Sequence, residues 1–381
     1  MAKKTSKKRK KSVRRKQTAR KPSTESGPVT LKQALAILDK KDAKKPKRRR
    51  AAKAGAARKK ATSKPITPEI VGEARKELDK GYRREIKSRT KQYDALMKIM
   101  MKRGVKGLPA APKKATRKSD RPSRRRGLFS PKPAGRPLQV FAEGDSWFDY
   151  PAFVFKGGLV PRLQKRLGVP ILNLSNAGDE VRNMLGVEER LVLIDKLEKG
   201  GPAGPWDLLL FSGGGNDIVG NPMALWIKDF KSGVAPEKLI DQNRFQSVLT
   251  IVRAGYIDLI GLRDQLSPNT HLMVHAYDFA IPDGRGICHL GPWLKPTFDL
   301  KNFPNRNSAF EVVKAMLKQF AAELKKLEKK TDNFTFVNCQ GTLSPRTSSW
   351  HNELHPSSKG FDKVAVKFHA KIKKLFPGNV L

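Results

Sequence analysis

The second half of the chain alternates between short apolar runs and segments with helical periodicity. The apolar runs predict strands, and the segments whose apolar residues recur every three or four positions predict helices. Near-continuous apolar strands alternating with helices are typical of a parallel sheet covered on both faces. The strands are expected at 138–142, 170–174, 206–212, 271–277 and 334–339, and the helices near 158–167, 181–199, 239–266, 307–330 and 357–376.

The segment 307–330 carries the clearest helical pattern. Ser308 stands three positions before Glu311, which is the spacing of a capping box, so we expect the helix to start there. Its apolar residues fall on one stripe: Phe310, Val313, Leu317, Phe320, Leu324 and Leu327.

The first part of the chain has a different pattern. Residues 1–66 are rich in Lys and Arg and contain no aromatic residue, which predicts a disordered basic arm with a short amphipathic turn or two at 31–39. Residues 67–103 predict one long helix, which we expect to be solvated or self-associating and packed on nothing specific. Residues 104–136 are a Pro, Gly and Arg linker. The helix is indicated by apolar residues that recur every four positions and then continue the stripe: Ile70, Ala74, Leu78, Tyr82, Ile86, Tyr93, Met97 and Met100.

Charge divides the chain at the end of the linker. Residues 1–136 contain 48 Lys and Arg against 10 Asp and Glu, a balance of +38, whereas residues 137–381 contain 31 against 25, a balance of +6. The second part is long enough to bury its own core. We therefore expect two objects, a basic arm and a domain at 137–381, and a chain that starts near Pro131 should keep the function of that domain.

A polycationic arm attracts polyanions by releasing their counterions. No aromatic residue precedes Tyr82, which favours phosphate contacts over base stacking. Non-specific nucleic acid is the first expected partner, an anionic membrane surface or polyphosphate is the second, and a solubilising tail without a partner is the alternative.

The location of the protein is expected to be intracellular. Cys288 and Cys339 are its two cysteines, and neither belongs to a C-x-x-C motif, which is typical of a reducing compartment. The N-terminus lacks an apolar signal region and no run reaches 18 apolar residues, so we expect no transmembrane segment. These features predict a cytoplasmic protein, with nucleoid or nuclear association through the arm, and leave the oligomeric state open.

Polar residues follow four of the five predicted strands. Ser146 follows the first in GDS, Gly178 the second in NAGDEV, Asn216 the third in GGGND, and His355 the fifth in NELHP. In a parallel sheet the carboxyl ends of the strands share one edge, where ligands bind. We expect these four residues to lie near one another.

In order and spacing, these blocks resemble those of the SGNH, or GDSL-type, serine hydrolase superfamily. The resemblance covers residues 138–381 and rests on GDSW, NAGDEVRNML, GGND and NELHP. It implies a flavodoxin-like three-layer sandwich with a five-stranded parallel sheet of order 2-1-3-4-5. We expect neither a cofactor nor a metal.

The residues themselves suit ester hydrolysis. Ser146 would be the nucleophile and His355 its general base. The backbone N–H groups of Ser146 and Gly178 and the amide of Asn216 would stabilise the oxyanion. This predicts an esterase or lipase that cleaves a small or lipid-like carboxylic ester through an acyl-Ser146 intermediate. The alternative is a nucleic-acid-binding protein whose hydrolase domain has lost activity.

One position departs from the superfamily. Its usual block is Asp-x-x-His, but the residue three positions before His355 is Asn352. An amide can orient the imidazole but cannot stabilise imidazolium by charge. Either Asn352 orients His355, or a backbone carbonyl does, or Glu353 replaces it. The long loops 217–238 and 278–305 are expected to form substrate walls or lids, or else packed loops without a special role.

Overall fold

The structure is a computed structural model that describes residues 27–43, 68–109, 136–150, 157–287 and 290–381. Most of the predicted arm and linker, together with Cys288, lies outside these residues. The side chains at 68–76, 78 and 79 also lie outside the description, so the predicted stripe can be followed only from Tyr82 onward.

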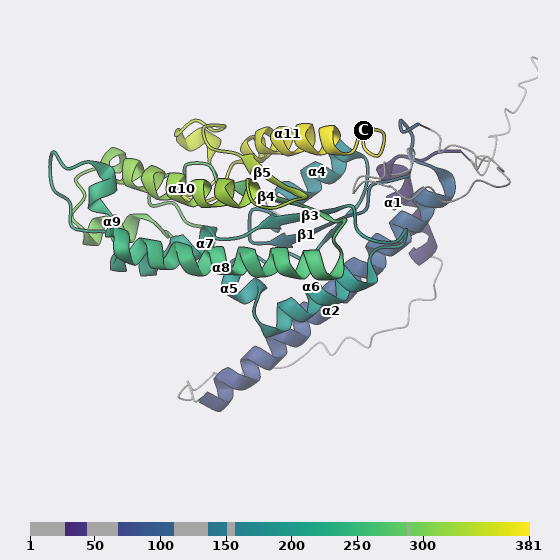
Figure 1. Ribbon diagram of the computed structural model, residues 1–381, viewed down its shortest axis with the longest axis horizontal. Helices are drawn as coiled ribbons and strands as arrows, with labels where there is room; N and C mark the ends of the chain where they lie inside the picture. Colours follow the sequence, from purple (N-terminus) through teal and green to yellow (C-terminus); the bar gives the residue numbers. More distant parts are fainter. Residues whose placement is uncertain (1–26, 44–67, 110–135, 151–156, 288–289) are drawn as a thin grey trace, which may run out of the picture.

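A five-stranded sheet forms the centre of the molecule (Figure 1). Every neighbouring pair of strands is parallel, and the strand order is β2-β1-β3-β4-β5. The predicted fold class, the predicted strands and the order implied by the resemblance are therefore confirmed. The strands are β1 (Val140–Gly144), β2 (Ile171–Asn173), β3 (Leu208–Ser212), β4 (His271–Ala276) and β5 (Phe334–Asn338).

Helices cover both faces of the sheet. Figure 1 shows α4 (Leu159–Leu167) and α11 (Ser358–Leu375) on one side and α6 (Val187–Lys199) and α8 (Gln242–Leu266) on the other. The helix α10 (Arg306–Glu328) packs beside α8 and against β4 and β5. Shorter helices complete the described fold: α5 (Val181–Met184), α7 (Gly215–Ile218), η1 (Asn221–Leu225), η2 (Pro236–Leu239), α9 (Lys295–Leu300) and η3 (Thr347–Ser349).

Helix boundaries differ from the prediction where the capping differs. The helix expected over 181–199 is interrupted at Leu185 and Gly186, between α5 and α6. The start expected at Ser308 is wrong, because the Asn305 side chain accepts the Ser308 N–H at 3.0 Å and the helix begins at Arg306. Asn is among the strongest N-cap residues, so it competes well with a Ser three positions later.

The long helix α2 (Pro68–Arg103) forms as predicted, but its expected lack of specific packing is wrong. Met97 and Met100 are fully buried, and the Tyr93 ring lies 5.4 Å from the Trp206 ring. The helix packs along β2, an edge strand of the sheet. Its apolar stripe therefore belongs to the same core as the sheet.

A second N-terminal helix, α1 (Leu31–Ala43), packs against α2. Val29 pairs with Val105 in a parallel bridge, and Ala34 is fully buried. The amphipathic turn expected at 31–39 is thus a longer helix, because α2 supplies a surface that buries its apolar side.

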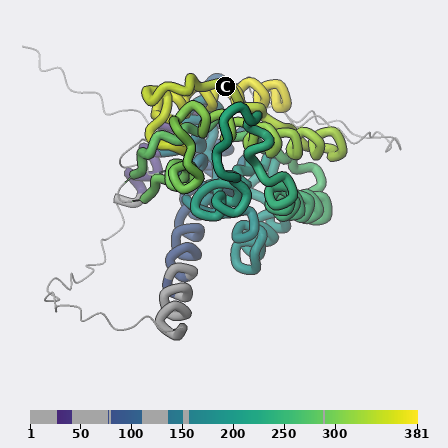
Figure 2. The backbone as a smooth tube through the Cα atoms, turned by 90° about the vertical axis from the view of Figure 1, so that its left-hand side faces the viewer, coloured from purple at the N-terminus to yellow at the C-terminus, as the bar shows by residue number. Residues whose placement is uncertain are grey.

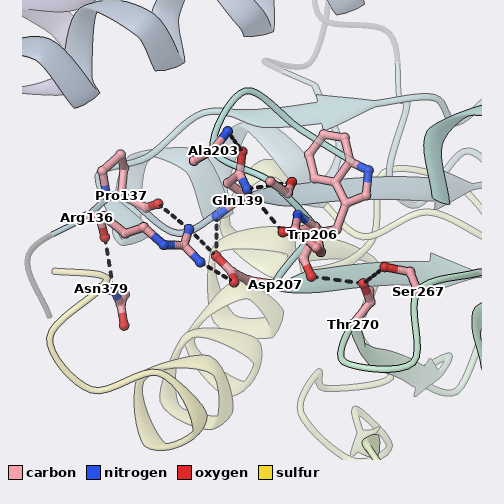
Figure 3. Close-up of polar contacts among 11 residues, drawn as sticks. Arg136, Pro137, Gln139, Ala203, Trp206, Asp207, Ser267, Thr270 and Asn379 are labelled. Atoms are coloured by element: carbon pink, nitrogen blue, oxygen red, sulfur yellow. Dashed lines mark hydrogen bonds and ion pairs between the residues drawn. The ribbon is translucent and has the colours of Figure 1, made fainter. Parts of the chain in front are cut away.

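The chain enters the sheet at the edge formed by the amino ends of its strands (Figure 3). Arg136 donates two hydrogen bonds to the Asp207 carboxylate, at 2.7 and 2.8 Å. Asp207 also accepts the Gln139 N–H at 2.9 Å, and the Asn379 amide donates to the Arg136 carbonyl at 2.9 Å. These bonds join the start of β1, the start of β3 and the C-terminal segment.

One described helix, α8, is long and apolar enough to cross a membrane by length and composition. Its buried side chains, which include Phe245, Leu249 and Tyr256, pack inside the fold. Core helices pass the same test, so α8 is weak evidence for a membrane span.

Candidate active site

Ser146 lies in a tight turn directly after β1. A Cβ atom on Gly144 would meet the Ser212 carbonyl oxygen at 2.6 Å, so only glycine allows β1 and β3 to approach so closely here. The Asp145 N–H donates to the same carbonyl oxygen at 3.0 Å. The turn is therefore fixed to the neighbouring strand, and Ser146 is 9% exposed.

The buried Asp145 carboxylate stabilises the turn through three hydrogen bonds. It accepts the Trp147 N–H at 3.0 Å, the Ser212 hydroxyl at 2.8 Å and the Tyr277 hydroxyl at 2.5 Å. Burial raises the pKa of Asp145 to about 6, although these three donors oppose the shift. The Ser212 hydroxyl also lies 2.9 Å from Nε2 of His275, whose pKa burial lowers to about 4. This network could not be predicted from the sequence, because its members come from the turn after β1, from β3 and from the end of β4.

His355 lies against the serine. Its Nε2 is 2.7 Å from the Ser146 Oγ, although the two residues are 209 positions apart. Burial and, to a smaller extent, the nearby His351 lower the pKa of His355 to about 3. The imidazole is therefore neutral near pH 7, as a general base must be.

The Asn352 side chain fixes the tautomer of His355. Its Oδ1 lies 2.9 Å from the His355 Nδ1 and also accepts the N–H groups of Leu354 at 3.0 Å and of His355 at 2.9 Å. Two backbone donors identify this atom as the oxygen, so the Nδ1 that faces it carries the imidazole proton. Nε2 then has a free lone pair directed at the Ser146 hydroxyl.

Tyr150 holds the other end of the Asn352 amide. The amide Nδ2 donates to the Tyr150 hydroxyl at 3.1 Å, and that hydroxyl lies 2.7 Å from the His351 Nδ1. The Tyr150 ring also stacks on the His355 ring, with centroids 4.4 Å apart. Sequence reasoning missed both Tyr150 and His351 in this role, since aromatic residues near a strand end usually indicate only packing.

Glu353 faces away from the imidazole. Its buried carboxylate accepts four backbone N–H groups, at 2.5 to 2.9 Å, from the loop that contains Trp293. Of the three alternatives for orienting His355, the geometry favours Asn352. The donors to Glu353 are Gly284, Trp293, Leu294 and Lys295.

The loop held by Glu353 lies beside the site. The Trp293 ring meets the His355 ring edge to face, with centroids 5.9 Å apart. This part of the segment 278–305, which was expected to form a wall or lid, therefore borders the imidazole.

Asn216 and Gly178 come from the two other blocks. The Asn216 Nδ2 donates to the Asp179 carbonyl at 2.8 Å, which leaves its second hydrogen for another acceptor. Gly178 has φ +93°, a left-handed conformation that favours glycine. Within the described part of the chain, the backbone N–H groups of Ser146 and Gly178 have no protein acceptor.

Ser146, Asn216 and His355 line one small cavity of about 30 Å³. Gly178 is not among the residues around it. Asn352 contacts His355 from behind the cavity. The cavity also has an aliphatic side made by Val219, Ala280, Leu317 and Leu354.

Among the residues that the structure describes, no three His, Cys, Asp or Glu side chains are arranged to hold a metal ion. Cys339 is buried, and burial raises the pKa of its thiol.

The part of the chain that contains these residues matches a known protein family. The family model for GDSL-like lipases and acylhydrolases matches residues 140–368. No curated protein matches the chain in sequence.

Three solved structures are similar to the chain at low identity. A lipase from a goat rumen metagenome is 18% identical, with 61% of this chain and 96% of that chain covered and a TM-score of 0.41. An extracellular lipase from Streptomyces rimosus is 15% identical, with 62% and 99% covered and a TM-score of 0.39. A family 3 carbohydrate esterase from Talaromyces cellulolyticus is 10% identical, with 63% and 98% covered and a TM-score of 0.37.

Proposed function

The chain belongs to the family of GDSL-like lipases and acylhydrolases and is an ester hydrolase. We propose that it cleaves carboxylic esters through an acyl-Ser146 intermediate. The observation that carries this proposal is the 2.7 Å contact between the Ser146 hydroxyl and the unprotonated Nε2 of His355. A serine hydroxyl is a weak nucleophile until such a base removes its proton.

In the acylation step, Ser146 Oγ attacks the ester carbonyl carbon while its proton passes to the His355 Nε2. The carbonyl oxygen becomes an oxyanion, which the N–H groups of Ser146 and Gly178 and the free amide hydrogen of Asn216 would stabilise. Each such donor contributes roughly 3 to 4 kcal/mol to a transition state of this kind. Collapse of the tetrahedral intermediate breaks the ester C–O bond, and Nε2 returns the proton to the departing alkoxide.

Deacylation repeats these steps with water. Water gives a proton to Nε2 and attacks the acyl carbon, and collapse releases the carboxylic acid and restores the Ser146 hydroxyl. The carboxamide of Asn352 keeps the imidazole in the required tautomer throughout. The cavity that Ser146, Asn216 and His355 line is small, about 30 Å³. We therefore propose short-chain esters as the substrate class.

Labelling with a fluorophosphonate probe tests the nucleophile. The full-length protein should be labelled in proportion to its p-nitrophenyl acetate hydrolysis, and Ser146→Ala should lose both signals while it keeps its circular dichroism spectrum. Ser212→Ala is a useful second variant, because Ser212 is a buried serine that faces Asp145 and should still allow labelling of Ser146. A folded wild type that neither takes the probe nor turns over any ester would contradict the proposal.

That last outcome would instead support the other function considered, a nucleic-acid-binding protein with an inactive hydrolase domain. The paired serine and imidazole do not favour it. We propose polyanion binding as a second property beside hydrolysis, supported by the charge of +38 carried by residues 1–136. We propose a cytoplasmic location from the two cysteines, neither of which belongs to a C-x-x-C motif.

A further inference from the structure

The helix α2 carries a row of six cations on one face. We name Lys80, Arg84, Lys87, Lys91, Lys98 and Lys102 the α2 cation row, and all six are exposed. They stand at i, i+4, i+7, i+11, i+18 and i+22, so they share one side of the helix, on which Asp94 and Ala95 also lie. At 1.5 Å per residue, the row is about 33 Å long.

The row lies on the side of α2 that does not pack against the sheet. The buried residues Ile86, Tyr93, Met97 and Met100 occupy the opposite part of the helix surface. A broad groove of about 770 Å³ runs between α2 and α6, and Lys87, Lys91 and Lys98 form part of its α2 rim. Figure 1 and Figure 2 show α2 at the periphery of the molecule, and the exposed side chains of the row are therefore accessible to a large partner.

Among the described residues, most cations of the row lack an ion-pair partner, although Lys98 lies close enough to the Asp94 carboxylate to counter the rise that burial causes in the pKa of that carboxylate. Lys80 pairs with Glu77 at 2.6 Å, but in the described part of the chain the other five have no carboxylate at ion-pair distance. By contrast, Lys314 and Lys326 of α10 each pair with a glutamate three positions earlier. Like charges at i and i+4 destabilise a helix by about 0.2 to 0.5 kcal/mol per pair, so the row costs stability unless an anion lies along it.

The chemistry of the row favours nucleic acid over a membrane. Interfacial helices insert large apolar or aromatic side chains beside their cations. The one exposed large hydrophobic residue among the described residues of α2 is Met101. The absence of exposed aromatic rings on this described surface also disfavours stacking on single-stranded bases. Duplex DNA carries one negative charge per ~1.7 Å of its axis, so a straight row of this length faces many phosphates at once.

We propose that the α2 cation row binds the phosphate backbone of duplex nucleic acid without sequence preference. The inference rests on the proposed polyanion binding and assigns part of it to a folded surface. Residues 44–67, which lead into α2, add 11 Lys and Arg and no acidic residue, so they extend the same charge.

Two full-length variants of equal charge test the proposal. In the first, Lys87, Lys91, Lys98 and Lys102 are replaced by Gln. In the control, Lys363, Lys371, Lys373 and Lys374 on the exposed face of α11 are replaced by Gln, so the net charge falls by the same amount. Gln is a good helix former, so both helices should persist. Fluorescence anisotropy with a labelled 24-base-pair duplex, measured at several salt concentrations, gives the slope of log affinity against log salt.

The α2 variant should lose up to about 3.6 units of that slope, at roughly 0.9 per phosphate contact, while the control stays within about one unit of the wild type. Equal losses in both variants would mean that net charge alone matters, and no loss in the α2 variant would assign binding to the arm; either result overturns the proposal. Binding to phosphatidylserine vesicles that falls in the α2 variant while duplex binding is unchanged would also overturn it, in favour of a membrane. A wild type that binds no duplex at all would remove the proposed polyanion binding itself, and esterase activity serves as the folding control in every case.

Discussion

At the scale of single residues, the most informative position is Asn352, where an amide stands in place of a charge. Its oxygen selects the imidazole tautomer, but nothing in the contact compensates a positive imidazolium. Burial therefore dominates, and it lowers the pKa of His355 to about 3. The residue is a base over an unusually wide pH range, though a weak one.

Asn352→Asp should move the acid limb of kcat/KM toward neutral pH. An adjacent carboxylate favours imidazolium and raises the pKa of His355, by about one to three units. The wild type should keep its kcat/KM for p-nitrophenyl acetate as the pH falls through 6.5, whereas the variant should lose activity at a higher pH and keep or increase its turnover at pH 8. A pH-stat assay measures kcat/KM across the acid range and turnover at pH 8. Asn243→Asp, on the exposed start of α8, adds the same charge outside the site and should shift nothing. Identical acid limbs in the wild type and Asn352→Asp would mean that this side chain does not face the imidazole.

Tyr150→Phe should lower kcat without changing KM. The ring that stacks on His355 remains, but the hydroxyl that accepts from the Asn352 amide nitrogen is lost, so the Asn352 side chain holds the imidazole less rigidly. The loss of one hydrogen bond of about 0.5 to 1.5 kcal/mol corresponds to a kcat lower by roughly 2- to 13-fold.

The same change in an Asn352→Asp background separates positioning from packing. A carboxylate has two equivalent oxygens, so in this background Tyr150→Phe should lower kcat by less than about twofold. The double-mutant cycle should then show coupling between Tyr150 and Asn352. An equal loss of kcat in the two backgrounds would mean that Tyr150 acts only by packing.

Sequence reasoning selected those site residues whose chemistry is local. Ser146, Asn216 and His355 follow strands in short polar blocks, and the structure places them around one cavity. The supporting residues could not be found in this way. Tyr150 is only four positions from Ser146, yet its contacts are with His351 and Asn352, about 200 positions away.

At the scale of elements, α2 supports the site although it lies outside the family match. The Arg89 guanidinium donates to the carbonyl oxygens of Asn173 at 3.1 Å and Ser175 at 3.0 Å, and to the Asp149 carboxylate at 2.9 Å. Asn173 and Ser175 lead into the loop of Gly178, and Asp149 belongs to the segment that follows Ser146. One side chain of α2 thus joins two of the loops that carry the site.

Arg89→Met should lower the melting temperature and esterase activity together. It removes these three hydrogen bonds together with two to Glu85, and it leaves the half-buried Asp149 carboxylate without its cation. Hydrogen bonds to charged groups contribute about 1.5 to 3 kcal/mol each. Arg83→Gln is the matched control, because the more exposed Arg83 pairs only with Glu188 at the surface. Thermal unfolding and p-nitrophenyl acetate hydrolysis should show little change in that control. Equal melting temperatures for the two variants would contradict the role given to Arg89.

The elements themselves were largely predictable. Strands buried on both faces are near-continuous apolar runs, so the pattern located all five to within about two residues. Two features were not accessible. The break at Leu185 and Gly186 lies inside a periodic segment, and the partner of the α2 stripe, which includes Trp206, cannot be recognised without the fold.

At the scale of the whole molecule, the boundary between the basic arm and the hydrolase domain moves toward the N-terminus. The sequence pattern predicted that a chain starting near Pro131 would fold and hydrolyse esters at nearly the full rate. Because α2 shares the core of the sheet, that chain would expose an apolar face along β2. The charge boundary and the packing boundary therefore lie at different places.

A chain of residues 131–381 should be less stable than the full chain and should bind the dye 1-anilinonaphthalene-8-sulfonate. A chain of residues 27–381 keeps α1 and α2 and should match the melting temperature and ester turnover of the full chain. Differential scanning fluorimetry and dye fluorescence compare the three proteins. A 131–381 chain as stable and active as the full chain would restore the original division.

The hydrogen bond between Ser146 and His355 also determines when the site can form during synthesis of the chain. It closes a loop of 209 positions, and its second partner follows β5, the edge strand that enters the sheet last along the chain. The turn of Ser146 and all five strands precede His355 in the chain, so they are synthesised before the imidazole. The proposed nucleophilic reactivity of Ser146 is thus the last property that the protein would acquire during synthesis, and fraying of the C-terminal segment would remove it while the sheet is still folded.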